Sequence, residues 1–101
     1  MANDNFSSLL SSTLVMEINA FIHRHGGDYA AWVVGVTADA DKALRAHGVD
    51  RAKHKVFTLN ALTDKRAGSV VGYFAAKGCV AGNEEDSGFL YCYRRAFNTT
   101  P

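Results

Sequence analysis

One segment of the chain constrains the fold more than any other. Residues 29–37 (YAAWVVGVT) are almost continuously apolar, and no charged side chain interrupts them. A strand with one face in water would alternate apolar and polar residues, so an unbroken apolar run is typical of a strand covered on both faces. The segment therefore predicts a central strand of a sheet.

Segments with helical periodicity and segments with strand periodicity alternate along the rest of the chain. Glycines stand where the helices are expected to end, since glycine readily adopts the left-handed conformation that closes many helices. The predicted elements, in chain order, are a helix over 5–25 ended by Gly26-Gly27, a strand over 29–37, a short helix from Asp39 to His47 ended by Gly48, a strand over 56–62, a helix over 64–77 ended by Gly78, a flexible acidic loop over 79–88 and a strand over 89–95.

This order of elements predicts an α/β domain, with α+β as the alternative class. We expect a small three-stranded sheet and three helices in the order α-β-α-β-α-β, because alternating elements pack as layers around one core. The 101 residues suffice for one domain, with residues 1–4 and 97–101 expected to be loose ends. A three-stranded sheet has two edge strands, and pairing with a second copy is one way to cover them.

The charge balance of the chain excludes several classes of protein. Eleven Lys and Arg residues stand against ten Asp and Glu, a net charge of +1, and 48% of the residues are hydrophobic. A disordered chain or a strongly basic, non-specific nucleic-acid binder would depart from that balance. No stretch approaches the roughly 20 apolar residues of a membrane span. The polar start MANDNFSS does not resemble a signal peptide, so we expect a cytoplasmic protein.

Cysteine and histidine usage indicates neither a redox pair nor a metal centre. Cys79 and Cys92 form no CxxC motif, and such isolated cysteines are typical of reduced, partly buried thiols. His23 and His25 would point about 200° apart on a helix, so they would not chelate one ion. We therefore expect no metal ion and no cofactor.

The segment from Gly35 to His47 follows the apolar run and opens a short helix. Members of the GIY-YIG nuclease family often read G-[IV]-T-x-D-P-x-R-R-L-x-x-H at this place, and the chain resembles that pattern around residues 33–47. The matching residues are Gly35, Val36, Thr37, Asp39, Leu44 and His47. The resemblance extends loosely over 29–95, because the following elements come in a compatible order.

The residues to which this resemblance would assign catalysis are missing. The tyrosine of the family's YIG triplet falls on Val33, its arginine on Ala43 and its metal-binding glutamate near Val71, while a long helix replaces its GIY strand. Phosphodiester cleavage needs a metal or a cationic side chain against the phosphate oxygens, and these residues supply neither. The resemblance therefore implies a degenerate domain without catalytic residues, whose apolar cleft is lined by Val33, Thr37, Ala43, His47 and Val71.

The leading hypothesis is a non-catalytic binding or interaction module. It would self-associate as a homodimer through a sheet edge or the apolar cleft, with an unidentified protein as a further partner. The alternative is a weak nucleic-acid binder, and a third hypothesis is an enzyme of unrecognised type. The nucleic-acid alternative uses a basic patch made of Arg51, Lys53, Lys55, Arg94 and Arg95, with base stacking from Tyr91 and Tyr93.

Overall fold

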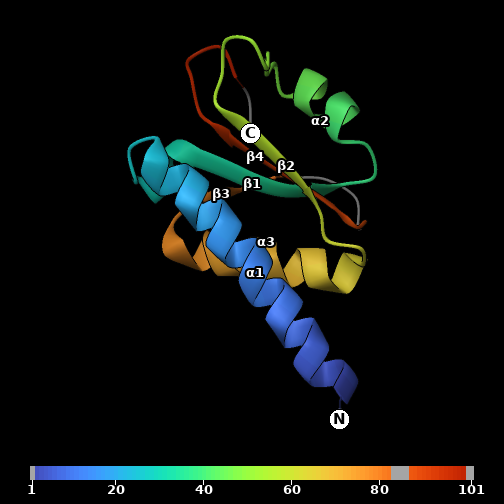
Figure 1. Cartoon of the computed structure of the whole chain (residues 1–101). Helices are drawn as coiled ribbons and strands as arrows, with labels where there is room; N and C mark the ends of the chain where they lie inside the picture. Colours follow the sequence, from blue (N-terminus) through green and yellow to red (C-terminus); the bar gives the residue numbers. More distant parts are fainter. Residues whose placement is uncertain (1, 83–86, 100–101) are drawn as a thin grey trace.

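A computed structural model describes residues 2–82 and 87–99, with side chains from residue 11 onward. The fold is mixed α+β, with helices packed on a four-stranded sheet (Figure 1). This confirms the predicted class at its coarse level, whereas the predicted three-stranded sheet is wrong. The elements are α1 (Ala2–Arg24), the 3-10 helix η1 (Tyr29–Ala31), β1 (Trp32–Thr37), α2 (Ala40–Ala46), β2 (Val56–Asn60), α3 (Asp64–Lys77), β3 (Val80–Ala81) and β4 (Phe89–Arg94).

The additional strand, β3, lies in the segment predicted to be an acidic loop. Val80 pairs in parallel with Val33, and Ala81 with Val34. A strand of two residues has no periodicity that a sequence could reveal, since its place is set by pairing with a strand distant in the chain. Residues 83–86 of the predicted loop lie outside the described part of the chain.

The strands lie in the order β2-β4-β1-β3, and β4 runs antiparallel to both of its neighbours. Trp32 is paired with Arg94, and Val56 with Tyr93. The starts of β1 and β2 therefore meet the end of β4 at one end of the sheet. Because η1 joins α1 to β1, the C-terminal end of α1 reaches the same place (Figure 1).

Helices cover both faces of the sheet. α1 and α3 pack on one face and α2 on the other (Figure 1), so β1 is buried from both sides as its apolar sequence predicts. Alternate strand residues contribute to the two cores. The α1/α3 side receives Trp32, Val34, Leu90 and Cys92, and the α2 side receives Val33, Tyr91 and Tyr93.

Side-chain caps define the starts of α2 and α3. Asp39 Oδ1 accepts a hydrogen bond from the N–H of Lys42 at 3.2 Å, and Thr63 Oγ1 accepts one from the N–H of Arg66 at 3.1 Å. These bonds satisfy N–H groups that the first turn of a helix leaves without partners. Gly78, at φ 114°, ends α3 in the left-handed conformation, as the sequence predicts.

The N-terminal part of α1 extends past the sheet and past α3 (Figure 1). At the other end, the N–H of Ala96 donates to Thr99 Oγ1 at 2.9 Å, and the N–H of Thr99 donates to the carbonyl of Ala96 at 3.0 Å. Of the predicted loose ends, residues 1, 100 and 101 lie outside the described ranges. Within those ranges, no helix has both the length and the apolar character to cross a membrane.

Candidate functional site

A histidine between two tyrosines fills the space under α2. His47 follows α2, with its Nε2 lying 3.1 Å from Tyr91 Oη and its Nδ1 lying 3.1 Å from Tyr93 Oη. The tyrosine rings are stacked with centroids 6.1 Å apart, and all three side chains are buried. This Tyr–His–Tyr cluster joins α2 to β4 and fills the space between His47 and the middle of β4.

Two glycines make room for one of these tyrosines. The phenol of Tyr91 lies against Gly35 of β1 and against Gly82, which follows β3, and a Cβ atom at either position would overlap it. Side chains in protein cores are packed too densely to absorb an overlap of this size. Gly35, matched in the sequence to a family motif, therefore has a packing role here.

The five residues predicted to line an apolar cleft do not come together around one. Val33 and Ala43 are buried beside the Tyr–His–Tyr cluster. Thr37 is also buried, and its Oγ1 accepts from the N–H of Asp39 and donates to the carbonyl of the same residue, both at 3.1 Å. Val71 belongs to the opposite core, because α3 lies on the other face of the sheet.

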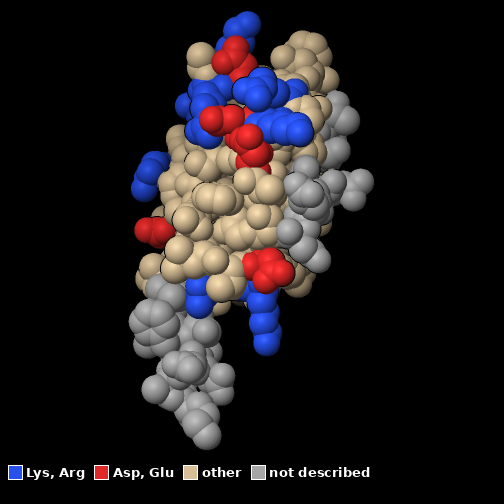
Figure 2. All heavy atoms as spheres, turned by 90° about the vertical axis from the view of Figure 1, so that its right-hand side faces the viewer, with Lys and Arg blue, Asp and Glu red and all other residues tan. Residues whose placement is uncertain are grey.

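The predicted basic patch is divided between two places. Arg51 Nη2 lies 3.1 Å from Asp41 Oδ1, so that cation is paired. Lys53 lies in the turn before β2, where its N–H donates to the carbonyl of Asp50 at 3.0 Å. Figure 2 shows Lys and Arg interspersed with Asp at the end of the molecule that carries α2. This part of the patch therefore has compensating negative charge close by.

The other basic residues meet a group of cations that the sequence analysis does not bring together. We define the cationic cluster as Arg24 and His25 at the end of α1, Lys55 before β2 and Arg94 at the end of β4. The N–H of Arg94 donates to the carbonyl of Lys55 at 3.0 Å. Phe21 holds the end of α1 against β2. Its ring centroid lies 4.7 Å from that of His25 and 5.0 Å from that of Phe57 in β2.

The pKa of His25 is sensitive to the positive charges gathered around it. Partial burial lowers the pKa of His25 from its ordinary 6.5, and the charges of Lys55, Arg24 and Arg94 lower it further. No carboxylate among the described residues forms an ion pair with Arg24, Lys55 or Arg94. Among the described residues, the cluster is therefore a positive surface without an ion-pair partner, contributed by three elements.

The segment after β4 continues this surface. Arg95 Nη1 donates to the carbonyl of Ala30 at 3.4 Å, and Phe97 is fully exposed. Asn98 Oδ1 lies 3.2 Å from Nε2 of His54, which places the segment beside the turn that leads into β2. An exposed aromatic ring thus follows the two arginines along one side of the molecule.

Arg24 and His25 are the members of the cluster that sequence reasoning missed. The only signal is the His-Arg-His run before Gly26-Gly27, whose positive charge is explained equally well by a favourable interaction with the end of the helix. Within the described residues, no three His, Cys, Asp or Glu side chains form a group that could hold a metal ion.

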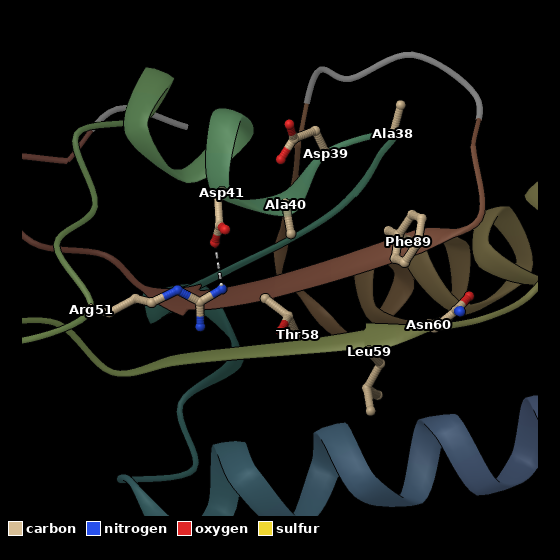
Figure 3. A pocket seen from close by; sticks show the side chains of 9 residues that line it. All are labelled: Ala38, Asp39, Ala40, Asp41, Arg51, Thr58, Leu59, Asn60 and Phe89. Atoms are coloured by element: carbon tan, nitrogen blue, oxygen red, sulfur yellow. Dashed lines mark hydrogen bonds and ion pairs between the residues drawn. The ribbon is translucent and has the colours of Figure 1, made fainter.

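A separate hollow of about 500 Å³ lies between α2 and β2 (Figure 3). Thr58, Asn60 and Phe89 lie on its sheet side, and the Arg51–Asp41 ion pair closes its α2 side, while the side chain of Leu59 points away toward α1. Three charged residues line this hollow, and two of them, Asp41 and Arg51, are paired with each other. It is less suited to a charged ligand than the cationic cluster is.

The two thiols are buried, and burial disfavours their thiolate form. Burial raises the pKa of Cys79 to about 11. Burial, together with the neighbouring Cys79, also raises the pKa of Cys92. Both are free cysteines in the α1/α3 core, and a neutral thiol is a poor nucleophile.

Comparisons with protein-family models, with curated proteins and with solved structures found no match to this chain.

Proposed function

We propose that this chain is a non-catalytic module that binds the phosphate backbone of a single-stranded nucleic acid. The observation that carries the proposal is the cationic cluster, in which Arg24, Lys55 and Arg94 converge without an ion-pair partner among the described carboxylates. Phosphate oxygens are strong acceptors for the donors of Arg and Lys. A phosphodiester strand would supply the negative charge that the described surface lacks.

Phe97 supports a single strand over a duplex. Its ring is fully exposed and follows Arg94 and Arg95 along the chain. Proteins that bind single strands combine a positive surface with aromatic rings on which unpaired bases stack, and each stacked base contributes about 1–3 kcal/mol. In a duplex the base faces are already stacked, so the ring would have no free base to contact.

The buried residues support a binding role over a catalytic one. His47 has a tyrosine hydroxyl beside each ring nitrogen, and the two thiols are buried and neutral.

The net charge of +1 predicts that the whole chain attracts a nucleic acid only weakly at long range. Binding should therefore depend on the local cluster and should fall steeply as salt is raised.

A matched pair of charge variants tests the proposal. Lys55→Gln removes a charge from the cluster at the start of β2, and Lys65→Gln removes the same charge beyond the other end of β2. Titration of a labelled oligothymidylate, followed by fluorescence anisotropy at several salt concentrations, should show weaker binding by Lys55→Gln. Its log–log salt slope should be shallower by about 0.7, the value for one phosphate contact on a single strand. Lys65→Gln should bind as the unmodified chain does.

Phe97→Ala separates base stacking from phosphate contact. Its affinity for the oligothymidylate should fall about tenfold, while its binding of inorganic pyrophosphate should stay the same. Undetectable binding of the oligothymidylate at low salt would refute the proposal. Equal losses in Lys55→Gln and Lys65→Gln would refute the assignment of binding to the cationic cluster.

A further inference from the structure

β2 is the longer edge of the sheet, and in the described part of the chain it has no charge, proline or bulge that would block pairing. The sheet order leaves one side of β2 without a neighbour, and its sequence VFTLN contains neither a charged residue nor proline. Its pairing with β4 is continuous over the whole strand, without a bulge. Edge strands of monomeric proteins are normally blunted by charge, proline or a bulge, so an edge of this kind is suited to a partner strand.

The hydrogen bonds at the two ends of β2 show which backbone groups face outward. The carbonyl of Lys55 accepts from Arg94, and the N–H of Ala61 donates to the carbonyl of Gly88. In an antiparallel pair, alternate residues bond to the neighbouring strand, so the odd-numbered residues of this segment bond to β4. Val56, Thr58 and Asn60 therefore turn their N–H and C=O groups away from it, and no described residue bonds to those outward groups.

We propose that β2 pairs in antiparallel fashion with β2 of a second copy, about a two-fold axis that passes beside Thr58. In this register Thr58 faces its own counterpart, and Val56 of each copy faces Asn60 of the other. Every outward N–H and C=O of these residues then has a partner. The two sheets become one continuous sheet, with β2 and its counterpart at its centre.

In this register the side chains of β2 in one copy lie opposite complementary side chains of β2 in the other. Phe57 of one copy lies opposite Leu59 of the other on the α1/α3 face, an aromatic–aliphatic pair of the kind that stabilises sheets. On the α2 face, threonine lies opposite threonine, which is also a favoured pair. Lys55 lies opposite Ala61, so no like charges meet across the interface. The side chains of a second copy therefore complement those of β2 better than the side chains of an arbitrary strand would.

Thr58 offers a direct test because the proposed axis passes beside it. Thr58→Lys brings two positive charges together in a dimer, and Thr58→Glu brings two negative charges together. Sedimentation velocity of the whole chain from micromolar to millimolar concentration should show a dimer for the unmodified chain and monomers for each variant. An equimolar mixture of the two variants should dimerise again, since opposite charges then face each other across the axis.

Ser12→Lys provides the matched control. Ser12 lines a groove of about 410 Å³ between α1 and α3, where Met16 and Tyr73 are exposed, and this groove is a second, apolar surface on which copies could associate. The variant should dimerise as the unmodified chain does. Loss of the dimer in Ser12→Lys together with its persistence in both Thr58 variants would overturn the proposal, and so would an unmodified chain that is monomeric throughout.

Hydrogen exchange of the unmodified chain tests the same interface without any substitution. The amides of Val56, Thr58 and Asn60 should exchange more slowly as concentration rises and the dimer fills, because their N–H groups then become bonded. The same amides exchanging at one rate in the monomer and the dimer would overturn the proposal even if a dimer is found. Neither measurement uses nucleic acid, so this result is independent of the oligothymidylate titration.

Discussion

At the scale of single residues, His25 gives the cationic cluster its response to pH. Its pKa lies below the ordinary 6.5 because the ring is partly buried and because Lys55, Arg24 and Arg94 are close. The imidazole is therefore neutral at neutral pH, and protonation in mild acid adds a further positive charge to the cluster. Between the folded and unfolded pKa values the unfolded chain binds more protons, so the contribution of His25 to stability is lost as pH falls through this range.

Removing a neighbouring charge should raise the pKa of His25. In Arg94→Gln the imidazolium has one cation fewer beside it, so an NMR titration of the ring protons should give a pKa closer to 6.5. Lys65→Gln, beyond the far end of β2, should leave the titration curve unchanged. The assignment of His25 to the cluster would be contradicted by an unaltered pKa in Arg94→Gln.

At the scale of elements, the sequence predicts correctly the features that depend on neighbouring residues. In the structure α3 is capped by Thr63 and ended by Gly78, both within a few residues of the helix ends. The predicted helix over 64–77 is confirmed, since capping depends on local hydrogen bonds. The apolar run likewise reveals β1, although its first residues form η1 instead, with Asp28 as their cap.

Features that depend on contacts between segments far apart in the sequence could not be predicted from the sequence. β3 exists because two residues reach β1, and the cationic cluster exists because antiparallel pairing brings Lys55 to Arg94 beside the end of α1. The residues predicted to line a cleft are divided between the two faces for the same reason: the sequence does not reveal which face α3 covers, and this decides where Val71 lies. Faces and neighbours of a sheet are properties of the assembled fold.

The connection from β2 to α3 contains a strained residue whose relief is testable. Leu62 has φ 73°, a conformation that costs most L-residues about 1–2 kcal/mol but that asparagine adopts more readily. Its side chain is 67% exposed, so little burial is lost on replacement. Leu62→Asn should raise the free energy of unfolding by about 1 kcal/mol in urea titrations, whereas Leu62→Val should lower it. A lower stability for Leu62→Asn would contradict strain as the dominant effect.

At the scale of the whole molecule, the alkylation rates of the two thiols should show which part of the α1/α3 core opens first. Cys92 lies in the interior strand β4 and is 1% exposed, whereas Cys79 precedes the short edge strand β3 and is 6% exposed. Opening the edge requires fewer contacts to break than opening the interior, so the two sites should differ in protection. Cys92 should become accessible only when the whole domain unfolds.

Alkylation kinetics measure this difference. With iodoacetamide at pH 8, mass spectrometry should find Cys79 labelled before Cys92, and both far more slowly than in the urea-unfolded chain, because burial keeps the thiols neutral and inaccessible. A mildly destabilising urea concentration should accelerate labelling of Cys92 in proportion to the unfolded fraction. Labelling of both thiols at one rate would show instead that the core opens as a single unit.

The fit of Tyr91 between Gly35 and Gly82 has a consequence for how this sequence can change over time. A mutation that adds a side chain at either glycine meets the phenol ring, so it is tolerated only in a background that already has a smaller residue at position 91. Loss of the ring, in turn, leaves a void that favours a larger residue at one of the two glycine positions. A Cβ atom at Gly82 would still lie 3.1 Å from Cα of Gly35, so the two glycines constrain each other as well as the tyrosine. Substitutions at the three positions should therefore be correlated among descendants of this chain.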